Sequence, residues 1–437
     1  MDWNSLQEAD RKFVWHPFTS AAADGGADPV IVVEGEGVWL RDSQGRSYLD
    51  GNASIWCNLH GHRHPRLDAA LRAQAAKIAH SSFLGLGNEP AALLARALVE
   101  TLRGEPPLGF PPEIQRSRIP ARVFYSDNGS CANEIAAKMA VQYFRNTGRP
   151  ERTGLVAFEG GYHGDTMLNV SLGGIGVFGE PYRALALKLT IVSDIGGLRE
   201  HLWHHGDTVA AVFLESALGG AGGIHPHRPG FMKEVADLTA RAGALLVVDE
   251  VLAGFGRTGT FLGCYHDGVC PDFITLSKGL TAGYLPLAVT LAREEVYQSF
   301  AGDYYSGRIL YHGHTYTGNP LACAVALENL KMFREENIMA QVASKIPAFE
   351  KGIRAFEGVK SVREVRSIGL IGGIELEQRR SRGDLARAAC LAARQHGVLT
   401  RPLGNTIVVM PPLCISLEHL AQLFDGIRAG ILQTAVG

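Results

Sequence analysis

The sequence predicts an α/β fold, with a large domain built around a mostly parallel β-sheet and a smaller α+β domain. Three observations lead to this prediction. Apolar runs of strand length alternate with amphipathic helical patterns between about residues 118 and 292. A long helical pattern at 320–337 then leads away from this unit. The remaining sequence carries a second, shorter set of strand and helix patterns, which we expect to form the smaller domain.

The N-terminal part precedes the alternating pattern. Residues 29–51 predict a strand, a turn and a strand, with the Asp-Ser-Gln-Gly sequence at 42–45 supplying the turn. Residues 64–80 predict a helix. We expect residues 1–60 to contribute to both the smaller domain and the functional site.

The alternating unit follows. Its strand patterns are mostly apolar throughout, which is typical of a parallel sheet that is covered on both faces. Strands are expected at 121–126, 152–158, 208–216, 244–251, 272–279 and 285–292, and helices at 130–146 and 229–243. We therefore expect residues 61–330 to form the large domain.

The smaller domain is expected at residues 331–437, in combination with the N-terminal part. Its predicted strands lie at 368–376 and 406–410, and its predicted helices at 384–397 and 417–433. The boundary near residue 330 falls next to the long helix, which we expect to bridge the two domains.

Composition excludes several classes of protein. The 437 residues include 42 Lys and Arg against 44 Asp and Glu, so there is no electrostatic reason to expect nucleic acid or an anionic membrane as a partner. No apolar run reaches the length of a transmembrane helix, and the first residues lack the apolar core of a signal peptide. The seven scattered cysteines predict reduced thiols rather than a disulfide framework. We expect a cytoplasmic protein.

Two histidine-containing stretches have residue types that could bind a metal. Cys264 and Cys270 flank His266, but the spacing is not that of a zinc ribbon. The histidines of His-Gly-His-Arg-His at 60–64 alternate in a way that would suit a metal, although structural roles are favoured for them. We expect no metal.

Polar residues follow three of the predicted strands. The Ser-Asp-Asn-Gly-Ser sequence at 126–130 lies between a strand and a helix, Asp249 ends a second strand, and Lys278 ends a third. In an open parallel sheet, ligands bind at the carboxyl ends of the strands. We therefore expect these residues to lie together.

Each of these residues has a functional and a structural interpretation. Gly129 and Ser130 at a helix N-terminus would bind phosphate, but Ser130 or Asn128 would also serve as an ordinary helix cap. Asp249 would suit a cationic ring nitrogen, or would bond to loop amides. Lys278 would be a nucleophilic amine with a lowered pKa in a desolvated pocket, or a side chain that extends from a strand end to solvent. Together they are the groups that pyridoxal phosphate requires.

The segment at 247–289 is similar to the signature of the class III (omega-type) aminotransferases of fold type I. The resemblance extends from residues 15–20 to residues 401–404. It implies that Lys278 holds pyridoxal phosphate and moves the reacting proton, that Asp249 keeps the pyridine nitrogen protonated, and that Gly129 and Ser130 bind the phosphate. It also implies that Tyr162, which His163 accompanies, stacks on the cofactor ring.

The resemblance also implies a homodimer with active sites at the interface. Gly313, His314 and Thr315 match a stretch that reaches the active site of the neighbouring subunit, where Thr315 contacts the phosphate. Glu215 matches an acidic residue near the cofactor. Gly219 departs from the family pattern, which has Gln there.

Within this family, the stretches at 13–20, 160–166 and 399–404 resemble the members that aminate 8-amino-7-oxononanoate to 7,8-diaminononanoate in biotin biosynthesis. The implied substrate-binding residues are Phe18, Ile55, Trp56, Gly313 and Arg401, of which Arg401 would pair with the substrate carboxylate. Many members have Tyr at the position of Phe18 and Trp at that of Ile55. The stretches at 56–63, 312–320 and 399–404 resemble a lysine-using branch of the family more closely, so we expect lysine, somewhat ahead of S-adenosylmethionine, as the amino donor.

Three alternatives remain open. Another omega-aminotransferase, acting on a diamine or an omega-amino acid, would share every cofactor residue. An aminomutase would need no second substrate. A binding protein without catalysis would not need Lys278, Asp249 and Tyr162 together, so their presence argues against it.

Overall fold

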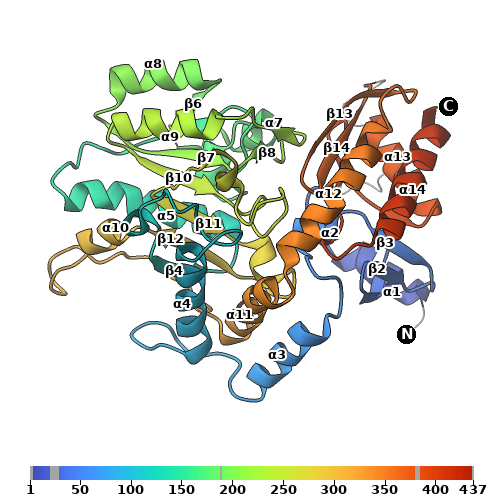
Figure 1. The fold of residues 1–437 in the computed structure, drawn as a ribbon, viewed down its shortest axis with the longest axis horizontal. Helices are drawn as coiled ribbons and strands as arrows, with labels where there is room; N and C mark the ends of the chain where they lie inside the picture. Colours follow the sequence, from blue (N-terminus) through green and yellow to red (C-terminus); the bar gives the residue numbers. More distant parts are fainter. Residues whose placement is uncertain (1–2, 20–28, 188, 379–383, 436–437) are drawn as a thin grey trace.

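The computed structural model describes residues 3–19, 29–187, 189–378 and 384–435. Figure 1 shows a large body built on one sheet and, on the right, a smaller body that holds both chain termini. The α/β class with a mostly parallel sheet is confirmed. The division at residues 60 and 330 stays a prediction.

The large sheet has seven strands in the order β4-β12-β11-β10-β7-β5-β6. Their bounds are β4 Arg122–Ser126, β5 Gly154–Phe158, β6 Thr190–Val192, β7 Val209–Glu215, β10 Leu245–Asp249, β11 Phe273–Leu276 and β12 Ala288–Ala292. β10 runs parallel to β7 and β11, whereas β12 runs antiparallel to β4 and β11. The carboxyl ends of β4, β7, β10 and β11 therefore meet along one edge.

Successive side chains along each strand point to opposite faces of this sheet, and apolar side chains on both faces pack against helices. In β7, Ala211 and Phe213 pack with α5 (Gly129–Asn146), whereas Val212 and Leu214 belong to the core on the opposite face. The helices that contribute to that opposite core include α4 (Glu89–Arg103), α8 (Ile195–His205), α9 (Phe231–Arg241) and α11 (Pro320–Glu335). Figure 1 shows α8 and α9 toward the β6 end of the sheet, at the top, and α4 and α11 toward its β4 end, at the bottom.

The smaller body contains two four-stranded sheets. One has the order β13-β14-β17-β16, with β13 Val362–Ile368, β14 Ile371–Leu376, β16 Pro402–Leu403 and β17 Thr406–Val409. The other joins β1 Val32–Glu36, β2 Trp39–Asp42 and β3 Ser47–Asp50 to β15 Val398–Leu399, so the N-terminal strands pair with a C-terminal strand. Helices α12 Ile338–Arg354, α13 Asp384–Gln395 and α14 Leu417–Ala435 belong to this part of the chain.

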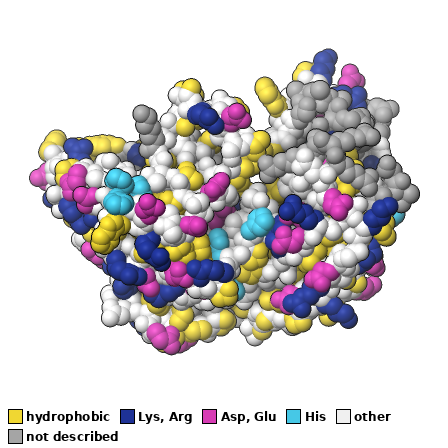
Figure 2. Space-filling view, turned by 90° about the horizontal axis from the view of Figure 1, so that it is seen from above, with side chains coloured by type: hydrophobic (Ala, Val, Ile, Leu, Met, Phe, Trp, Pro, Cys, Tyr) yellow, Lys and Arg dark blue, Asp and Glu magenta, His cyan; other side chains and the backbone are white. Residues whose placement is uncertain are grey.

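The remaining elements are short, apart from two helices. They are α1 Trp3–Phe13, α2 Ala53–Trp56, α3 Pro65–Ala75, α6 Met167–Leu172, α7 Gly176–Gly179, α10 Glu294–Ser299, β8 Leu218–Gly219 and β9 His225–Pro226. None of the described helices combines the length and the apolar content that crossing a bilayer requires. Figure 2 shows cationic and anionic side chains interspersed over one face, in keeping with the near-neutral net charge.

Three element predictions need correction. Residues 29–51 hold three strands rather than two, because the first run is interrupted at Gly37, whose backbone pairs with His62. The helix predicted at 64–80 ends at Ala75. The strand predicted at 272–279 ends at Leu276, so Lys278 begins a short 3-10 turn at Lys278–Thr281.

Candidate functional site

A cavity of about 220 Å³ lies at the carboxyl ends of the central strands. It is lined by residues from segments that are far apart in sequence. The lining includes six of the predicted site residues: Trp56, Gly129, Ser130, Tyr162, Asp249 and Lys278. The convergence expected from the strand ends is therefore present in the structure.

The N-terminus of α5 forms one wall of this cavity. Asn128 is the helix cap, because its side-chain oxygen accepts a hydrogen bond from the Cys131 N–H at 2.9 Å. Ser130 is not the cap: its Oγ accepts a hydrogen bond from the Asp165 N–H at 3.2 Å. The cap and the anion site are thus separate features of the same turn, and the phosphate interpretation does not compete with capping.

At this wall, the backbone at Gly129 and Gly164 packs closely against neighbouring residues. A Cβ atom at Gly129 would lie 2.8 Å from a methyl group of Val251, and one at Gly164 would lie 2.0 Å from Ser130 Oγ. Larger residues at either position would push the neighbouring loops away from the helix end. The free N–H groups of the first turn and the Ser130 hydroxyl therefore line a narrow site that fits a phosphate group.

Asp249, at the end of β10, also lines the cavity and is 6% exposed. Its Oδ2 accepts hydrogen bonds from Asn133 Nδ2 at 2.7 Å and from His163 Nδ1 at 2.9 Å, and its Oδ1 accepts one from the Val251 N–H at 3.0 Å. Burial lowers the pKa of His163, but the hydrogen bond and the charge of Asp249 outweigh burial and raise it. The carboxylate is held rigidly at the cavity wall.

Sequence reasoning missed Asn133. Its side chain donates to Asp249 and to the His163 carbonyl at 3.0 Å, and accepts from Thr275 Oγ1 at 2.9 Å. A signal was present, because Asn133 is a polar residue on the apolar, buried face of α5. A fully buried amide in such a place requires hydrogen-bond partners.

Lys278 projects into the same cavity. Burial lowers the pKa of its amine, while the charges of Asp249 and Glu215 oppose that effect. Its Nζ lies 5.0 Å from the centroid of the Trp56 ring. Its backbone has a φ of 41°, which is uncommon for a residue with a side chain. A desolvated amine with a lowered pKa is a good nucleophile toward a carbonyl carbon.

Tyr162 and Glu215 connect two of the cavity's loops. The Tyr162 N–H donates to Glu215 Oε2 at 3.0 Å, and the Tyr162 hydroxyl donates to Asp165 Oδ2 at 3.0 Å. Glu215 Oε1 accepts from the Gly220 N–H at 3.0 Å. Burial raises the pKa of Glu215 to about 7, so this carboxyl binds a proton more tightly in the folded chain than in the unfolded chain.

This pKa shift predicts a pH effect on stability. The folded chain holds more protons than the unfolded chain between the usual glutamate pKa of 4.5 and about 7, so ionising Glu215 costs stability as the pH rises through that window. Glu215→Gln has no carboxyl to ionise at this position. Between pH 5 and pH 7.5, we therefore expect the Tm of the wild type to fall relative to the Tm of the variant. Equal pH dependence of the two melting temperatures would contradict the shift.

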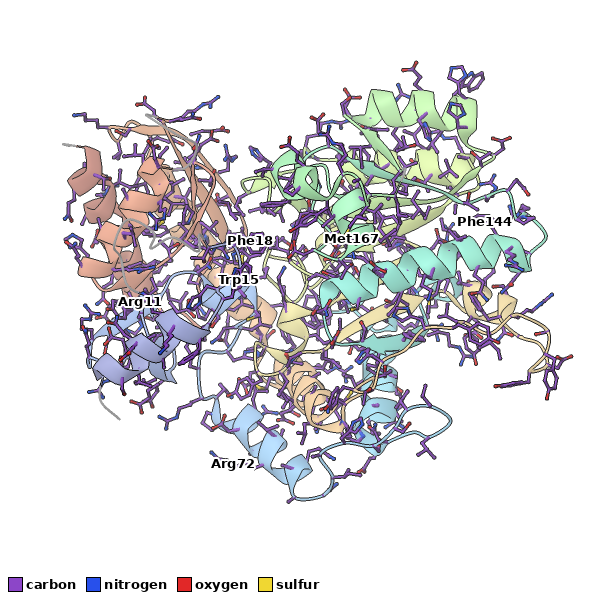
Figure 3. The ribbon with its side chains drawn as sticks, turned by 180° about the vertical axis from the view of Figure 1, so that it is seen from behind. Arg11, Trp15, Phe18, Arg72, Phe144 and Met167 are labelled. Atoms are coloured by element: carbon purple, nitrogen blue, oxygen red, sulfur yellow. The ribbon has the colours of Figure 1, made fainter. Side chains whose placement is uncertain are left out.

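Four predicted substrate residues lie outside the cavity lining: Phe18, Ile55, Arg401 and Gly313. The Phe18 ring lies 5.6 Å from the Phe178 ring, which in turn lies 6.1 Å from Tyr162. Figure 3 shows Phe18 and Trp15 on the segment after α1, on the side of the molecule toward Met167. Ile55 is 45% exposed.

Arg401 is the third of these residues. Burial lowers the pKa of its guanidinium, and its charge interacts with Tyr162. The described residues supply no carboxylate partner within ion-pair distance. An anion that approaches past Tyr162 would therefore find a partly desolvated cation.

Gly313, His314 and Thr315 are not brought to Lys278 within one chain. They line a separate cavity of about 690 Å³, together with Phe83 and Leu84. His314 Nε2 is buried there without a hydrogen-bond partner. The sequence prediction placed these residues at the active site of a neighbouring subunit, and that placement stays a prediction.

The histidines considered as metal ligands have structural contacts. His60 Nε2 lies 2.7 Å from Asn329 Oδ1, and burial lowers the pKa of His60 to about 4. His62 Nε2 lies 3.0 Å from Asp50 Oδ2, and His266 Nε2 lies 3.1 Å from the Thr258 carbonyl. Among the described residues, no three His, Cys, Asp or Glu side chains are grouped to hold a metal.

Comparison with known proteins adds the following similarities. Residues 21–431 match the family model for "Aminotransferase class-III". The chain is 39% identical to the adenosylmethionine-8-amino-7-oxononanoate aminotransferase of Geobacter sulfurreducens, with 98% of each chain covered. It is 38% identical to the protein of that name from Aquifex aeolicus, with 99% of this chain and 98% of that protein covered.

Solved structures show the same similarity. The crystal structure of adenosylmethionine-8-amino-7-oxononanoate aminotransferase from Methanocaldococcus jannaschii superposes with a TM-score of 0.92 at 35% identity, with 99% of each chain covered. An amine transaminase from an uncultivated Pseudomonas species, solved in its PLP-bound form, gives a TM-score of 0.88 at 29% identity over 97% of this chain and 99% of that one.

Proposed function

Because the chain belongs to the class-III aminotransferase family, we propose that it aminates 8-amino-7-oxononanoate to 7,8-diaminononanoate, a step of biotin biosynthesis. The cofactor is pyridoxal phosphate. The observation that carries the proposal is a single cavity lined by Lys278, Asp249 and the α5 N-terminus, in a chain that matches relatives of this activity over nearly its full length.

The cavity residues fit the cofactor. The N–H groups at Gly129 and Ser130 and the Ser130 hydroxyl would bind its phosphate, and Asp249 would keep its ring nitrogen protonated. Tyr162 would cover one face of the ring. When bound, pyridoxal phosphate supplies an electron sink for the bond that breaks at the substrate carbon.

The protein's own groups then perform three tasks. The Lys278 amine holds the cofactor, is displaced by the amine of the donor, and moves the proton at the substrate carbon. Asp249, fixed by Asn133 and His163, keeps its charge in place through both halves of the reaction. The desolvated Arg401 would bind the carboxylate of the acceptor and orient its ketone toward Lys278.

The amino donor is either S-adenosylmethionine or lysine. The names of the relatives favour adenosylmethionine. The lysine expectation rests on the resemblance of residues 56–63, 312–320 and 399–404 to a lysine-using branch, beside the departures at Phe18 and Ile55, and it stays a prediction. Single-donor reactions with each compound decide between them.

The role of Arg401 gives a direct test of the acceptor. Replacing Arg401 with Gln removes a charge-assisted, bidentate contact, and we expect the KM for 8-amino-7-oxononanoate to rise about 10- to 100-fold. The first half-reaction, measured with an excess of donor, should change much less. Arg394→Gln is the control, because burial also lowers the pKa of Arg394, but Tyr162 interacts with the guanidinium of Arg401 and is not among the groups that act on Arg394.

Two results would count against this acceptor. An unchanged KM in Arg401→Gln would remove the carboxylate contact from the proposal. Higher kcat/KM with diamines or omega-amino acids than with 8-amino-7-oxononanoate would favour another omega-aminotransferase, the class named for several structural neighbours at 26–28% identity.

We further propose a homodimer in which each active site receives Gly313, His314 and Thr315 from the second subunit. Two features support it. These residues line a cavity of their own, apart from Lys278, and the adjoining Leu84, Tyr311 and Tyr316 side chains are 80%, 74% and 62% exposed in the single chain. Exposed aromatic and aliphatic side chains of this kind are typical of a surface that another chain covers. The expected cytoplasmic location remains part of the proposal.

Mixed dimers test this arrangement. Thr315→Asp places a negative charge beside the expected phosphate, and Lys278→Ala removes the reactive amine, so each homodimer should be inactive. A heterodimer that carries one variant in each subunit has one intact site, and about half of the wild-type activity per dimer is expected. Thr315→Ser, which keeps the hydroxyl, should remain active. An inactive heterodimer, or a fully active Thr315→Asp homodimer, would contradict shared sites.

A further inference from the structure

The loop between β8 and β9 consists almost entirely of glycine. It reads Gly219-Gly220-Ala221-Gly222-Gly223 and ends at Ile224. Glycine-rich backbone loses more conformational freedom on ordering than any other backbone, and this segment has only one methyl group with which to pack. Any fixed conformation of the loop must therefore be imposed by its surroundings.

This loop is part of the functional cavity. Leu218 and Ala221 line the cavity, and the Gly220 N–H donates to Glu215. Glu215 in turn accepts from the Tyr162 N–H. Glu215 therefore links the loop to Tyr162, the residue expected to cover the cofactor ring, and a shift of the loop would alter the hydrogen bonds that hold Tyr162.

Arg366, on β13 of the smaller body, holds the end of this loop. Its Nε donates to the Ile224 carbonyl at 3.0 Å, and its Nη2 donates to the Gly223 carbonyl at 2.8 Å. Its Nη1 donates to Glu364 Oε2 and Glu375 Oε2, both at 2.6 Å. The guanidinium is nearly buried and has its charge matched by two carboxylates, so its orientation is fixed.

The neighbouring strand is shaped to receive the loop. Gly373 on β14 lies directly across from Arg366, and a Cβ atom there would lie 3.1 Å from Ile224 Cβ. Ile224 also belongs to a small buried cluster with Ile371 and Val408 of the same sheet and Trp56 of the cavity. The sheet therefore provides a surface at Gly373 on which the loop packs closely, and it carries the Arg366 guanidinium that binds the carbonyls of the loop.

We infer that Arg366 is a positioning residue, which fixes the 219–224 loop against the smaller body and thereby sets the wall of the substrate cavity. It acts through the loop and Glu215 and makes no contact with the cavity itself. The effect on substrate binding rests on the proposed function, whereas the effect on loop order does not.

The geometry of the side chain separates this role from simple charge pairing. A lysine at position 366 would keep a positive charge beside Glu364 and Glu375, but its single ammonium cannot reproduce the planar fork that reaches both carbonyls and both carboxylates. Arg363 is a matched control on the same strand: it also pairs with Glu375, at 3.3 Å, but it is exposed and does not bond to the loop.

The test compares Arg366→Gln, Arg366→Lys and Arg363→Gln with the wild type by hydrogen–deuterium exchange of the peptide that covers residues 218–224. We expect exchange in this peptide to rise about tenfold in both Arg366 variants and to stay unchanged in Arg363→Gln. The KM for 8-amino-7-oxononanoate should rise with it by about tenfold, with kcat reduced less than threefold. The Lys variant suffices if the Gln variant does not fold.

Several results would overturn the inference. They are unchanged exchange in Arg366→Lys, a wild-type KM in that variant despite faster exchange, or an equal rise in Arg363→Gln. If no variant and no wild-type protein acts on 8-amino-7-oxononanoate, the proposed function fails, while the exchange measurement still decides whether Arg366 orders the loop.

Discussion

Replacing Lys278 with Ala is expected to abolish amino transfer, with kcat lowered by about 10⁴-fold or more. Among the residues that the structure describes, Lys278 is the only lysine that lines the cavity, and burial lowers the pKa of its amine. The variant loses both the group that holds the cofactor and the group that moves the proton. No neighbouring side chain in the lining replaces it, because the other ionisable groups are acids, a histidine and a tyrosine.

The measurement combines activity with covalent trapping. Borohydride treatment of the wild type should attach the cofactor irreversibly to the peptide that contains Lys278, and mass spectrometry should find no such adduct in Lys278→Ala. Lys345→Ala is the control, because burial also lowers the pKa of Lys345, but this amine donates to the Leu413 carbonyl, and Lys345 does not line the cavity. Trapping at another lysine in the wild type, or full activity of Lys278→Ala, would contradict the assignment.

Replacing Asp249 with Asn should lower kcat by about 10²- to 10³-fold, which is the cost of removing a preorganised charge from a water-poor site. The amide is similar in size to the carboxylate, so the cavity should keep its shape. Its NH₂ group cannot accept a hydrogen bond, so the variant loses either the contact from the Val251 N–H or the two contacts that Asn133 and His163 make with the same oxygen. The bound cofactor should also show an altered visible absorbance, because its ring nitrogen no longer has a charged partner.

Asp272→Asn serves as the control for this variant. Asp272 is a partly buried carboxylate of the same sheet region, but it pairs with Arg293 outside the cavity. We expect a lower Tm and a nearly unchanged kcat from the control. A kcat for Asp249→Asn within threefold of the wild type would show that the charge at this position is not needed.

Much of the candidate site could be predicted from the rule that ligands bind at the carboxyl ends of the strands of a parallel sheet. The residues Gly129, Ser130, Asp249 and Lys278 were grouped because each follows an apolar strand, and the structure places all four around one cavity. The rule works because a parallel sheet brings the carboxyl ends of its strands to one edge, whatever the sequence distance between them. The roles of these residues stay predictions until the variants are measured.

Other features depend on long-range contacts that a local pattern does not encode. The apolar pattern of β12 gives no direction, and only pairing with β4 and β11 makes it antiparallel. The break at Gly37 depends on pairing with His62. Arg366 meets its loop across more than 140 residues, and nothing in the sequence around either segment indicates that contact.

Phe18, Ile55 and Gly219 are the positions where the sequence differs from the family pattern, and the single chain places none of them in the cavity lining. Phe18 contacts Phe178 rather than the cavity lining, and Ile55 is partly exposed. A Cβ atom at Gly219 would meet nothing within 4 Å, so the missing Gln side chain leaves open space rather than a repacked wall. None of these three residues lines the Lys278 cavity, so the single chain assigns them no contact with substrate.

Transfer of labelled nitrogen is the most direct test of the central claim. The purified holoenzyme is incubated with 8-amino-7-oxononanoate and either ¹⁵N-labelled lysine or ¹⁵N-labelled S-adenosylmethionine, and the product is identified by mass spectrometry. We expect 7,8-diaminononanoate carrying one ¹⁵N atom with at least one donor, and none with Lys278→Ala. Absence of labelled 7,8-diaminononanoate with both donors, from enzyme that aminates another ketone or aldehyde, would contradict the proposed function.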